Sequence, residues 1–146
     1  MSVSNVREIL NKKGSTIWSV SPQFTVSETL KLMVEKNVGA VLVLDGGKIA
    51  GIFSERDFVR FSVKKNLELD KTQIKDLMTT RILFVSPAQT TEECMSLMTA
   101  KRIRHLPVIE NDQVIGLISI GDVVSKVIED HKFSITQLER YVTGEY

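Results

Sequence analysis

The stretch Gly51-Ile52-Phe53-Ser54-Glu55-Arg56-Asp57 recurs 65 residues later as Gly116-Leu117-Ile118-Ser119-Ile120-Gly121-Asp122. Each copy has a glycine in an apolar strand end, a hydroxyl residue, and an aspartate three positions further on. An apolar helical pattern follows each copy, so the hydroxyl and the carboxylate lie at a strand-to-helix junction. Free backbone N–H groups at such a junction favour an anion. The same Ser-x-x-Asp spacing also forms a helix-capping box that needs no ligand, so the motif alone leaves both interpretations open.

The stretch is part of a longer internal repeat. Residues 20–60 align with residues 85–125 without a gap, and 13 of the 41 positions are identical, against roughly two or three expected from average residue usage. Each copy opens with Val-Ser-Pro, continues with a Thr-x-x-Glu capping box, and then has two apolar runs joined by a turn, which is typical of a hairpin. The predicted order in each copy is strand, helix, strand, strand, helix. We therefore predict an α+β fold made of two such units.

The boundaries of the repeats divide the chain into five parts. We expect a lead-in helix over residues 1–14, a first repeat over 15–66, a connector over 67–79, a second repeat over 80–130 and a C-terminal helix over 131–146. Basic residues followed by Gly14 end the lead-in helix. The C-terminal helix is predicted to pack on the repeats or on a partner subunit, through apolar residues at near-helical spacing. These residues are Phe133, Ile135, Leu138, Tyr141 and Val142.

Composition excludes several classes of function. A chain of 146 residues with 42% hydrophobic residues can bury its own core as one domain. The net charge of +1 gives no overall attraction to nucleic acid or to a membrane, and no apolar run approaches 18 residues. No signal-peptide pattern is present, and a single cysteine, Cys94, favours a reducing compartment, so we expect a cytoplasmic protein. No metal-ligand spacing, phosphate-binding glycine loop or nucleophile elbow is present. We therefore expect neither an enzyme nor a metal protein.

Over residues 15–130 the repeat resembles the cystathionine-β-synthase (CBS) domain, and two copies in tandem resemble a CBS pair, or Bateman module. The resemblance implies a disc-like pseudo-twofold module, with the repeats packed through their sheets and two clefts between them. It also implies an adenosine ligand, for which we place AMP first and ATP, ADP and NAD next, and no covalent cofactor. A homodimer that regulates an unknown partner protein is expected. The alternatives are an S-adenosylmethionine sensor and a ligand-independent scaffold subunit.

The resemblance also assigns roles to individual residues. Asp57 and Asp122 are expected to accept hydrogen bonds from ribose hydroxyls, with Ser54 and Ser119 near the phosphate. Arg104 and His105 are expected to contact phosphate, because a guanidinium fork and an imidazole suit phosphate oxygens. A solvated basic cluster is the alternative for this pair.

In the family's crossed arrangement, each cleft also uses segments from elsewhere in the chain. The Ser119/Asp122 cleft is then expected to use Ser15, Thr16, Val38 and Gly39. The Ser54/Asp57 cleft is expected to use Thr80, Arg81 and Ile103. Arg56 is expected to supply to the first cleft the positive charge for phosphate that the uncharged Gly39 lacks. Gly121 stands in the place of Arg56 in the second copy. We therefore predict unequal occupancy of the two clefts.

Overall fold

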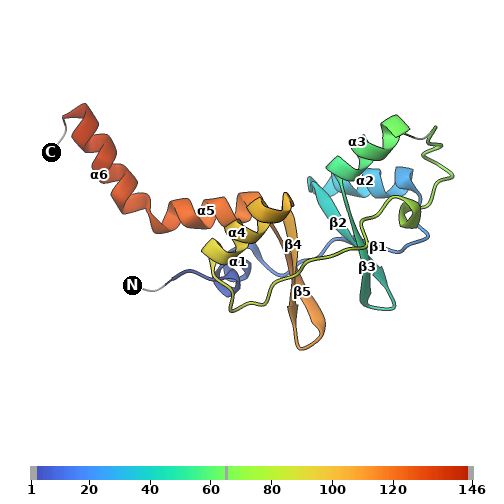
Figure 1. Ribbon diagram of the computed structural model, residues 1–146, viewed down its shortest axis with the longest axis horizontal. Helices are drawn as coiled ribbons and strands as arrows, with labels where there is room; N and C mark the ends of the chain where they lie inside the picture. Colours follow the sequence, from blue (N-terminus) through green and yellow to red (C-terminus); the bar gives the residue numbers. More distant parts are fainter. Residues whose placement is uncertain (1–2, 65, 145–146) are drawn as a thin grey trace.

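A computed structural model describes residues 3–64 and 66–144. Two repeats lie side by side, each a hairpin covered by helices (Figure 1). The first repeat consists of β1 (Ser19–Val20), α2 (Val26–Lys36), β2 (Ala40–Asp45), β3 (Lys48–Ser54) and α3 (Glu55–Lys64). The second consists of α4 (Thr91–Lys101), β4 (His105–Glu110), β5 (Gln113–Ser119) and α5 (Ile120–Asp130). Outside them are α1 (Val6–Lys13), the 3-10 helix η1 (Ile74–Asp76) and α6 (Lys132–Thr143). The predicted α+β fold of two repeats is confirmed.

The two sheets differ at their first strand. In the first repeat β1 pairs in parallel with β2, which pairs antiparallel with β3. In the second repeat the predicted first strand is reduced to one parallel bridge between Val85 and Val108 beside the β4–β5 hairpin. Leu42 N donates to Trp18 O at 3.2 Å in the first repeat. Its counterpart 65 residues later is Pro107, which has no N–H to donate, so this strand pair is shorter.

The helix caps and turns follow the sequence pattern. Thr25 Oγ1 accepts from Glu28 N at 3.1 Å while Glu28 Oε1 accepts from Thr25 N at 3.2 Å, and Thr90 and Glu93 repeat this capping box. The second hairpin turn uses Asn111 at φ 53° and Asp112 at φ 61° where the first uses two glycines. Asn and Asp tolerate this left-handed conformation better than other side chains, so the turn chemistry is preserved without glycine.

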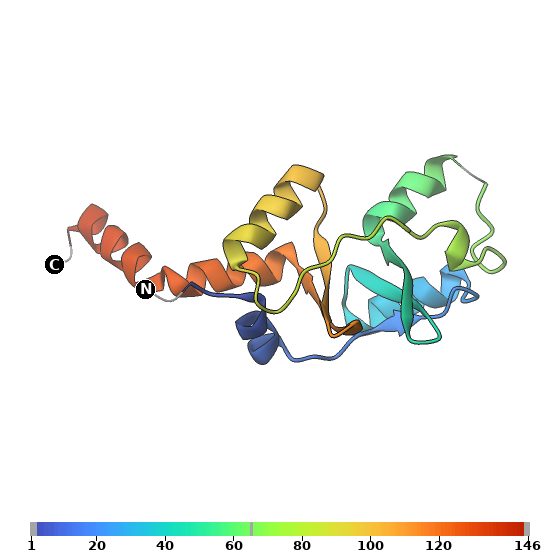
Figure 2. The ribbon, with the colours of Figure 1, turned by 60° about the horizontal axis from the view of Figure 1, so that its bottom comes forward.

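Each repeat is completed by the chain segment that precedes the other repeat in sequence. Helix α1 packs on the second repeat, where Val6 N donates to Gln89 O at 2.9 Å. The connector packs on the first repeat in the same way, with Ile74 N donating to Phe24 O at 2.7 Å. Figure 2 shows α1, in dark blue, against the second repeat and the chain then crossing to β1 of the first. The lead-in helix therefore belongs in space to the second repeat.

These two segments also enter the two hydrophobic cores. The core of the second repeat contains Val6, Ile9 and Leu10 of α1. The core of the first repeat contains Ile74 and Leu77 of the connector. The core of the second repeat is therefore complete only with α1, and the core of the first repeat only with the connector.

Helix α6 continues from α5 and extends away from both repeats (Figure 1). Leu138 and Val142 are 66% and 83% exposed on it. The predicted C-terminal helix is therefore present, but the side chains of Phe133, Ile135 and Tyr141 lie outside the described residues. Among the described helices, none combines the length and the apolar character needed to cross a bilayer.

We predict that two equivalent glycines differ in their tolerance of a methyl group. A Cβ at Gly51 would lie 2.6 Å from Met78 Sδ and 2.9 Å from the backbone oxygen of Thr79, whereas the three atoms nearest a Cβ at Gly116 all belong to the side chain of Leu10. Since a backbone cannot move aside as a side-chain methyl can, Gly51→Ala should lower the free energy of unfolding by about 2 kcal/mol and Gly116→Ala by about 1 kcal/mol. Urea unfolding measures both.

Gly121→Ala is the control for this pair. Gly121 lies in α5, and a Cβ added there would come near only Ser119 Oγ, at 3.6 Å. Because alanine has a higher helix propensity than glycine, this change should leave the free energy of unfolding unchanged or raise it. Equal losses for Gly51→Ala and Gly116→Ala would contradict the prediction.

Candidate functional site

A cleft of about 350 Å³ lies between the two repeats and is lined by both. From the first repeat it receives the end of β3 and the first turns of α3, and from the second repeat the end of α4 and the start of β4. The extended segment after η1 forms a third wall. The predicted site residues that line this cleft are Gly39, Ser54, Arg56, Asp57, Arg81, Ile103, Arg104 and His105.

Asp57 lies at the N-terminus of α3 and is 7% exposed. Its Oδ2 accepts hydrogen bonds from the backbone N and the Oγ of Ser54, at 2.9 and 3.0 Å. Its Oδ1 accepts from Thr79 Oγ1 at 3.1 Å. A neutral hydroxyl is therefore the donor on Oδ1, and a carboxylate oxygen has lone-pair capacity for a further donor.

The lining of this cleft is rich in positive charge. Arg56 Nη1 donates to the backbone oxygen of Arg102 at 2.8 Å, so one guanidinium joins α3 of the first repeat to the end of α4 in the second. Further cations line the cleft without forming an ion pair to any residue in the described part of the chain. They are Arg60, Arg81, Lys101, Arg102 and Arg104. Only Glu55 and Asp57 oppose them among the lining residues, so the cleft can hold an anion.

Some lining residues were missed in the sequence. Thr79, rather than the predicted Thr80, lines the cleft, where its hydroxyl donates to Asp57 Oδ1. Arg60 lies one helical turn after Arg56, and this spacing of four could have revealed it. Lys101 and Arg102 were visible as part of a basic run but were not assigned.

The second Ser-x-x-Asp motif has a different set of partners. Asp122 Oδ2 accepts from Ser119 N at 2.8 Å, as in a capping box, and from Lys13 Nζ at 2.6 Å. Lys13 Nζ also donates to Leu117 O at 2.7 Å. In the sequence, Lys13 is recognisable only as part of a helix stop, so this contact was not predicted.

Several residues expected at the second cleft lie elsewhere. Gly39 lines the first cleft, and Val38 packs on the hydrophobic core of the first repeat. Lys13, two residues before Ser15, is the residue of this segment that reaches Asp122, and neither Ser15 nor Thr16 hydrogen-bonds to it within the described residues. The reason is that α1 runs helically to Lys13 and brings this ammonium to the motif before the chain leaves for the first repeat.

His105 lies between the two motifs. Its Nε2 faces Gly39 and the side chain of Glu55 in the first cleft, while in the β4–β5 pair it lies opposite Ser119. Burial is the largest influence and lowers the pKa of His105. The charges of Lys13 and Arg104 lower this pKa further, and those of Asp122 and Glu55 act against them. At neutral pH, His105 is therefore held uncharged beside the cationic lining.

Asp122 is shifted in the direction expected for a paired carboxylate. Burial alone raises its pKa, but the hydrogen bond and charge of Lys13 and the hydrogen bonds of Ser119 together outweigh burial and hold the pKa below its usual value. Asp122 is thus ionised and paired with Lys13 near neutral pH.

Comparison with known proteins identifies the fold. The CBS-domain family model matches residues 6–64 and again residues 74–129. The Arabidopsis thaliana protein named "CBS domain-containing protein CBSX3, mitochondrial" is 36% identical over 152 residues, covering 99% of this chain and 73% of that protein. A protein of solved structure with CBS domains from Burkholderia ambifaria MC40-6 is 45% identical, with a TM-score of 0.84 over 87% of this chain and 96% of the other. This chain therefore belongs to the CBS-domain family, as a tandem pair.

A more distant structural neighbour was solved with ligands. The CBS domain pair of protein MJ0100, described in complex with 5-methylthioadenosine and S-adenosyl-L-methionine, has a TM-score of 0.76 over 88% of this chain and 98% of its own. At 19% identity this likeness supports the fold alone. The family matches begin at α1 and at η1, so each match includes the segment that completes the opposite repeat.

We predict that His105 makes the protein less stable as the pH falls from 7.5 to 5.5. Because the pKa of His105 is lowered on folding, the unfolded chain, with a histidine pKa of about 6.5, binds more protons across this range. The free energy of unfolding should therefore fall with pH below about 6.5 and level off below the pKa of the folded state. Urea unfolding at a series of pH values measures the slope.

His105→Gln should remove most of this slope. The chain has two histidines, so His131→Gln, at the end of α5, is the matched control and should retain it. An unchanged slope in His105→Gln would contradict the prediction.

Proposed function

We propose that this CBS pair is a regulatory module that binds an adenine nucleotide in the cleft at Asp57. The observation that carries the proposal is that Asp57, at a helix N-terminus, shares one cleft with cations from both repeats that form no ion pair within the described residues. An ionised carboxylate suits the vicinal hydroxyls of a ribose, and arginines suit phosphate oxygens. The apolar side chains of Ile82, Leu83 and Ile103 in the same lining suit a purine ring.

The charge of the lining bears on which adenosine ligand is preferred. The resemblance seen in the sequence places AMP first among AMP, ADP, ATP and NAD. The excess of cations favours a longer phosphate chain, since each further phosphate adds charge-assisted hydrogen bonds. S-adenosylmethionine carries a sulfonium cation, which the same lining would repel. We therefore favour ATP and ADP over AMP, and a nucleotide over S-adenosylmethionine.

The mechanism follows from the position of the cleft between the repeats. A ligand that contacts α3 of one repeat and the start of β4 in the other binds best in one relative arrangement of the two. Its affinity then differs between arrangements, and this difference is what shifts their populations. Arg56 is well placed to take part, since it already joins the repeats through Arg102. The role is regulatory rather than catalytic.

Homodimerisation and a regulated partner protein are part of the proposal. Exposed apolar side chains on the helices support it, among them Val59 and Val63 on α3 and Ile128 on α5. A single cysteine, Cys94, buried in the second repeat, suits a reducing compartment such as the cytoplasm.

A ligand-independent scaffold is the second candidate function. Both Ser-x-x-Asp motifs form capping hydrogen bonds without a ligand, which is the observation that favours it. A partner that binds equally well with and without nucleotide, and with Asp57→Asn, would support the scaffold.

We expect Asp57→Asn to weaken ATP binding by about tenfold or more, because a charged acceptor for the ribose is lost while the amide can still accept the capping hydrogen bond. Calorimetric titration into nucleotide-stripped protein measures the affinity. Asp122→Asn is the matched control in the other motif and should change the affinity less than about threefold. No binding by the folded wild-type protein would overturn the proposed function.

We also expect Arg104→Gln to weaken ATP binding by about tenfold and AMP binding by less, because the loss of a guanidinium matters more to the ligand with more phosphates. Competition titrations of ATP, ADP, AMP and S-adenosylmethionine measure the order of affinity. Lys48→Gln, on the exposed start of β3 away from the cleft, should leave all affinities unchanged. Tighter binding of S-adenosylmethionine than of ATP would refute the assignment of a nucleotide.

A further inference from the structure

The two motifs offer the same pair of acceptors, a strand carbonyl and a carboxylate, to different donors. In the first repeat Thr79 N donates to Ile52 O at 2.8 Å and Thr79 Oγ1 donates to Asp57 Oδ1 at 3.1 Å. In the second repeat the corresponding acceptors are Leu117 O and Asp122. Lys13 Nζ donates to Leu117 O at 2.7 Å and to Asp122 Oδ2 at 2.6 Å, the carboxylate oxygen that also accepts from Ser119 N. Where the first repeat has a backbone N–H and a neutral hydroxyl, the second therefore has one ammonium, which binds Oδ2 of the carboxylate where Thr79 binds Oδ1.

This replacement changes what a ligand would meet. At Asp57 a ribose hydroxyl competes with, or adds to, the weak hydrogen bond of a neutral hydroxyl. At Asp122 a ribose hydroxyl meets a carboxylate whose charge is already paired with the ammonium of Lys13, and charge-assisted hydrogen bonds are roughly twice as strong as neutral ones. The side chains of Lys13 and Asp122 are 38% and 24% exposed, so solvent weakens the ion pair but does not remove it.

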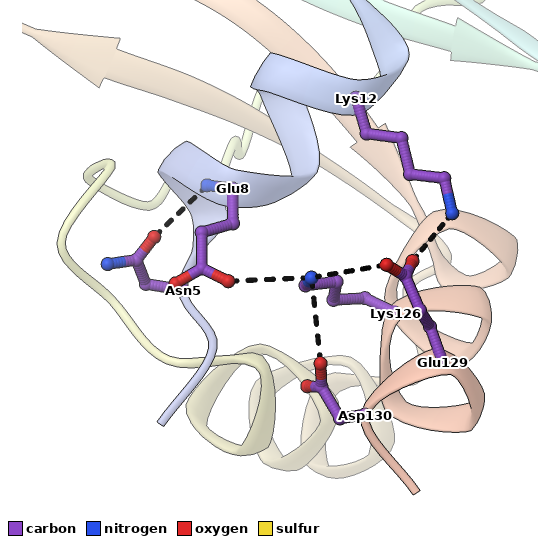
Figure 3. Close-up of polar contacts among 6 residues, drawn as sticks. All are labelled: Asn5, Glu8, Lys12, Lys126, Glu129 and Asp130. Carbon is purple, nitrogen blue, oxygen red and sulfur yellow. Dashed lines mark hydrogen bonds and ion pairs between the residues drawn. The ribbon is translucent and has the colours of Figure 1, made fainter. Parts of the chain in front are cut away.

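Lys13 is held in place by the helix that carries it. Val6, Ile9 and Leu10 of α1 are buried in the core of the second repeat, and Asn5 and Gly14 cap the two ends of the helix. Polar contacts fix its outer face as well (Figure 3), where Lys12 Nζ lies 2.5 Å from Glu129 Oε2 and Lys126 Nζ lies 3.4 Å from Glu8 Oε2. Little chain entropy is therefore lost when the Lys13 side chain pairs with Asp122, because its backbone is already ordered.

We propose that Lys13 is a built-in cation that closes the second cleft, so that the chain binds one nucleotide, at Asp57, while α1 is docked on the second repeat. This inference rests on the proposed function and adds the regulation of the paired site. The second motif is complete in Ser119 and Asp122, and a single side chain supplied from α1 occupies it. The lowered pKa of Asp122 agrees with a carboxylate held by this contact.

The test is the stoichiometry of ATP binding in Lys13→Gln, with Lys12→Gln as the matched control. Both changes remove one lysine charge from the last turn of α1, but Lys12 pairs with Glu129 rather than with Asp122. Calorimetry should give one ATP per chain for the wild type and for Lys12→Gln, and two for Lys13→Gln. The affinity of the second cleft for ATP should rise by about tenfold or more in Lys13→Gln. The additional site should disappear in Lys13→Gln/Asp122→Asn and persist in Lys13→Gln/Asp57→Asn.

The outcomes separate this inference from the proposed function. One ATP in both the wild type and Lys13→Gln, or two in both, overturns the closing role of Lys13 and leaves nucleotide binding intact. No ATP in the wild type but one in Lys13→Gln, lost with Asp122→Asn, upholds the closing role and refutes the site at Asp57. No binding in any folded variant overturns both.

A second readout needs no ligand. Carboxyl-carbon NMR should show the pKa of Asp122 rising in Lys13→Gln and unchanged in Lys12→Gln. An unchanged pKa in Lys13→Gln would show that the ion pair does not hold Asp122 in solution, and would overturn the inference.

Discussion

The packing of Leu10 against Gly116 and of Met78 against Gly51 is the contact on which the rest of the arrangement depends. At each position a side chain lies so close to the strand that a Cβ would come within 2.6 Å of it. The absence of a Cβ permits this approach, and it lets α1 or the connector enter the core of each repeat. Helix α1 leads into the first repeat but completes the core of the second, and the connector leads into the second repeat but completes the core of the first. The path of the chain therefore links the two repeats, in addition to the contacts between their surfaces.

The same exchange makes the two halves chemically unequal. After η1 the chain becomes extended and presents Thr79 to its motif, whereas α1 stays helical to Lys13 and presents an ammonium. A duplicated sequence therefore gives two geometrically similar junctions with different electrostatics. Lys101, Arg102 and Arg104 in the lining of the first cleft come from the second repeat, as does His105, which lies between the two motifs. Each cleft thus depends on residues that no single repeat contains.

Much of the fold could be predicted from the sequence because its signals are local. Capping boxes, hairpin turns and the repeated order of elements are set by neighbouring residues, as Thr25 with Glu28 and Asn111 with Asp112 illustrate. The docking of α1 on the second repeat could not be predicted in this way, since Arg7 pairs with Glu110 over 103 positions. For the candidate site, the sequence allowed the residues of the doubled motif and the basic residues near Arg104 to be picked out. The role of Lys13 could not be predicted, because it depends on where α1, which is far away in sequence, ends.

The long separation between α1 and its partners has a consequence for the order in which the chain folds. The first repeat can close as soon as the connector has been made, but α1 is synthesised first and Asp122 follows 109 positions later. At typical rates of about 5–20 residues per second, the apolar face of α1 stays uncovered for roughly 5–20 seconds. Of the contacts that complete the two cores, those of α1 join the residues that lie furthest apart in sequence. Contacts of this kind slow folding. A nascent or destabilised chain is therefore expected to expose Val6, Ile9 and Leu10 while the first repeat is already folded.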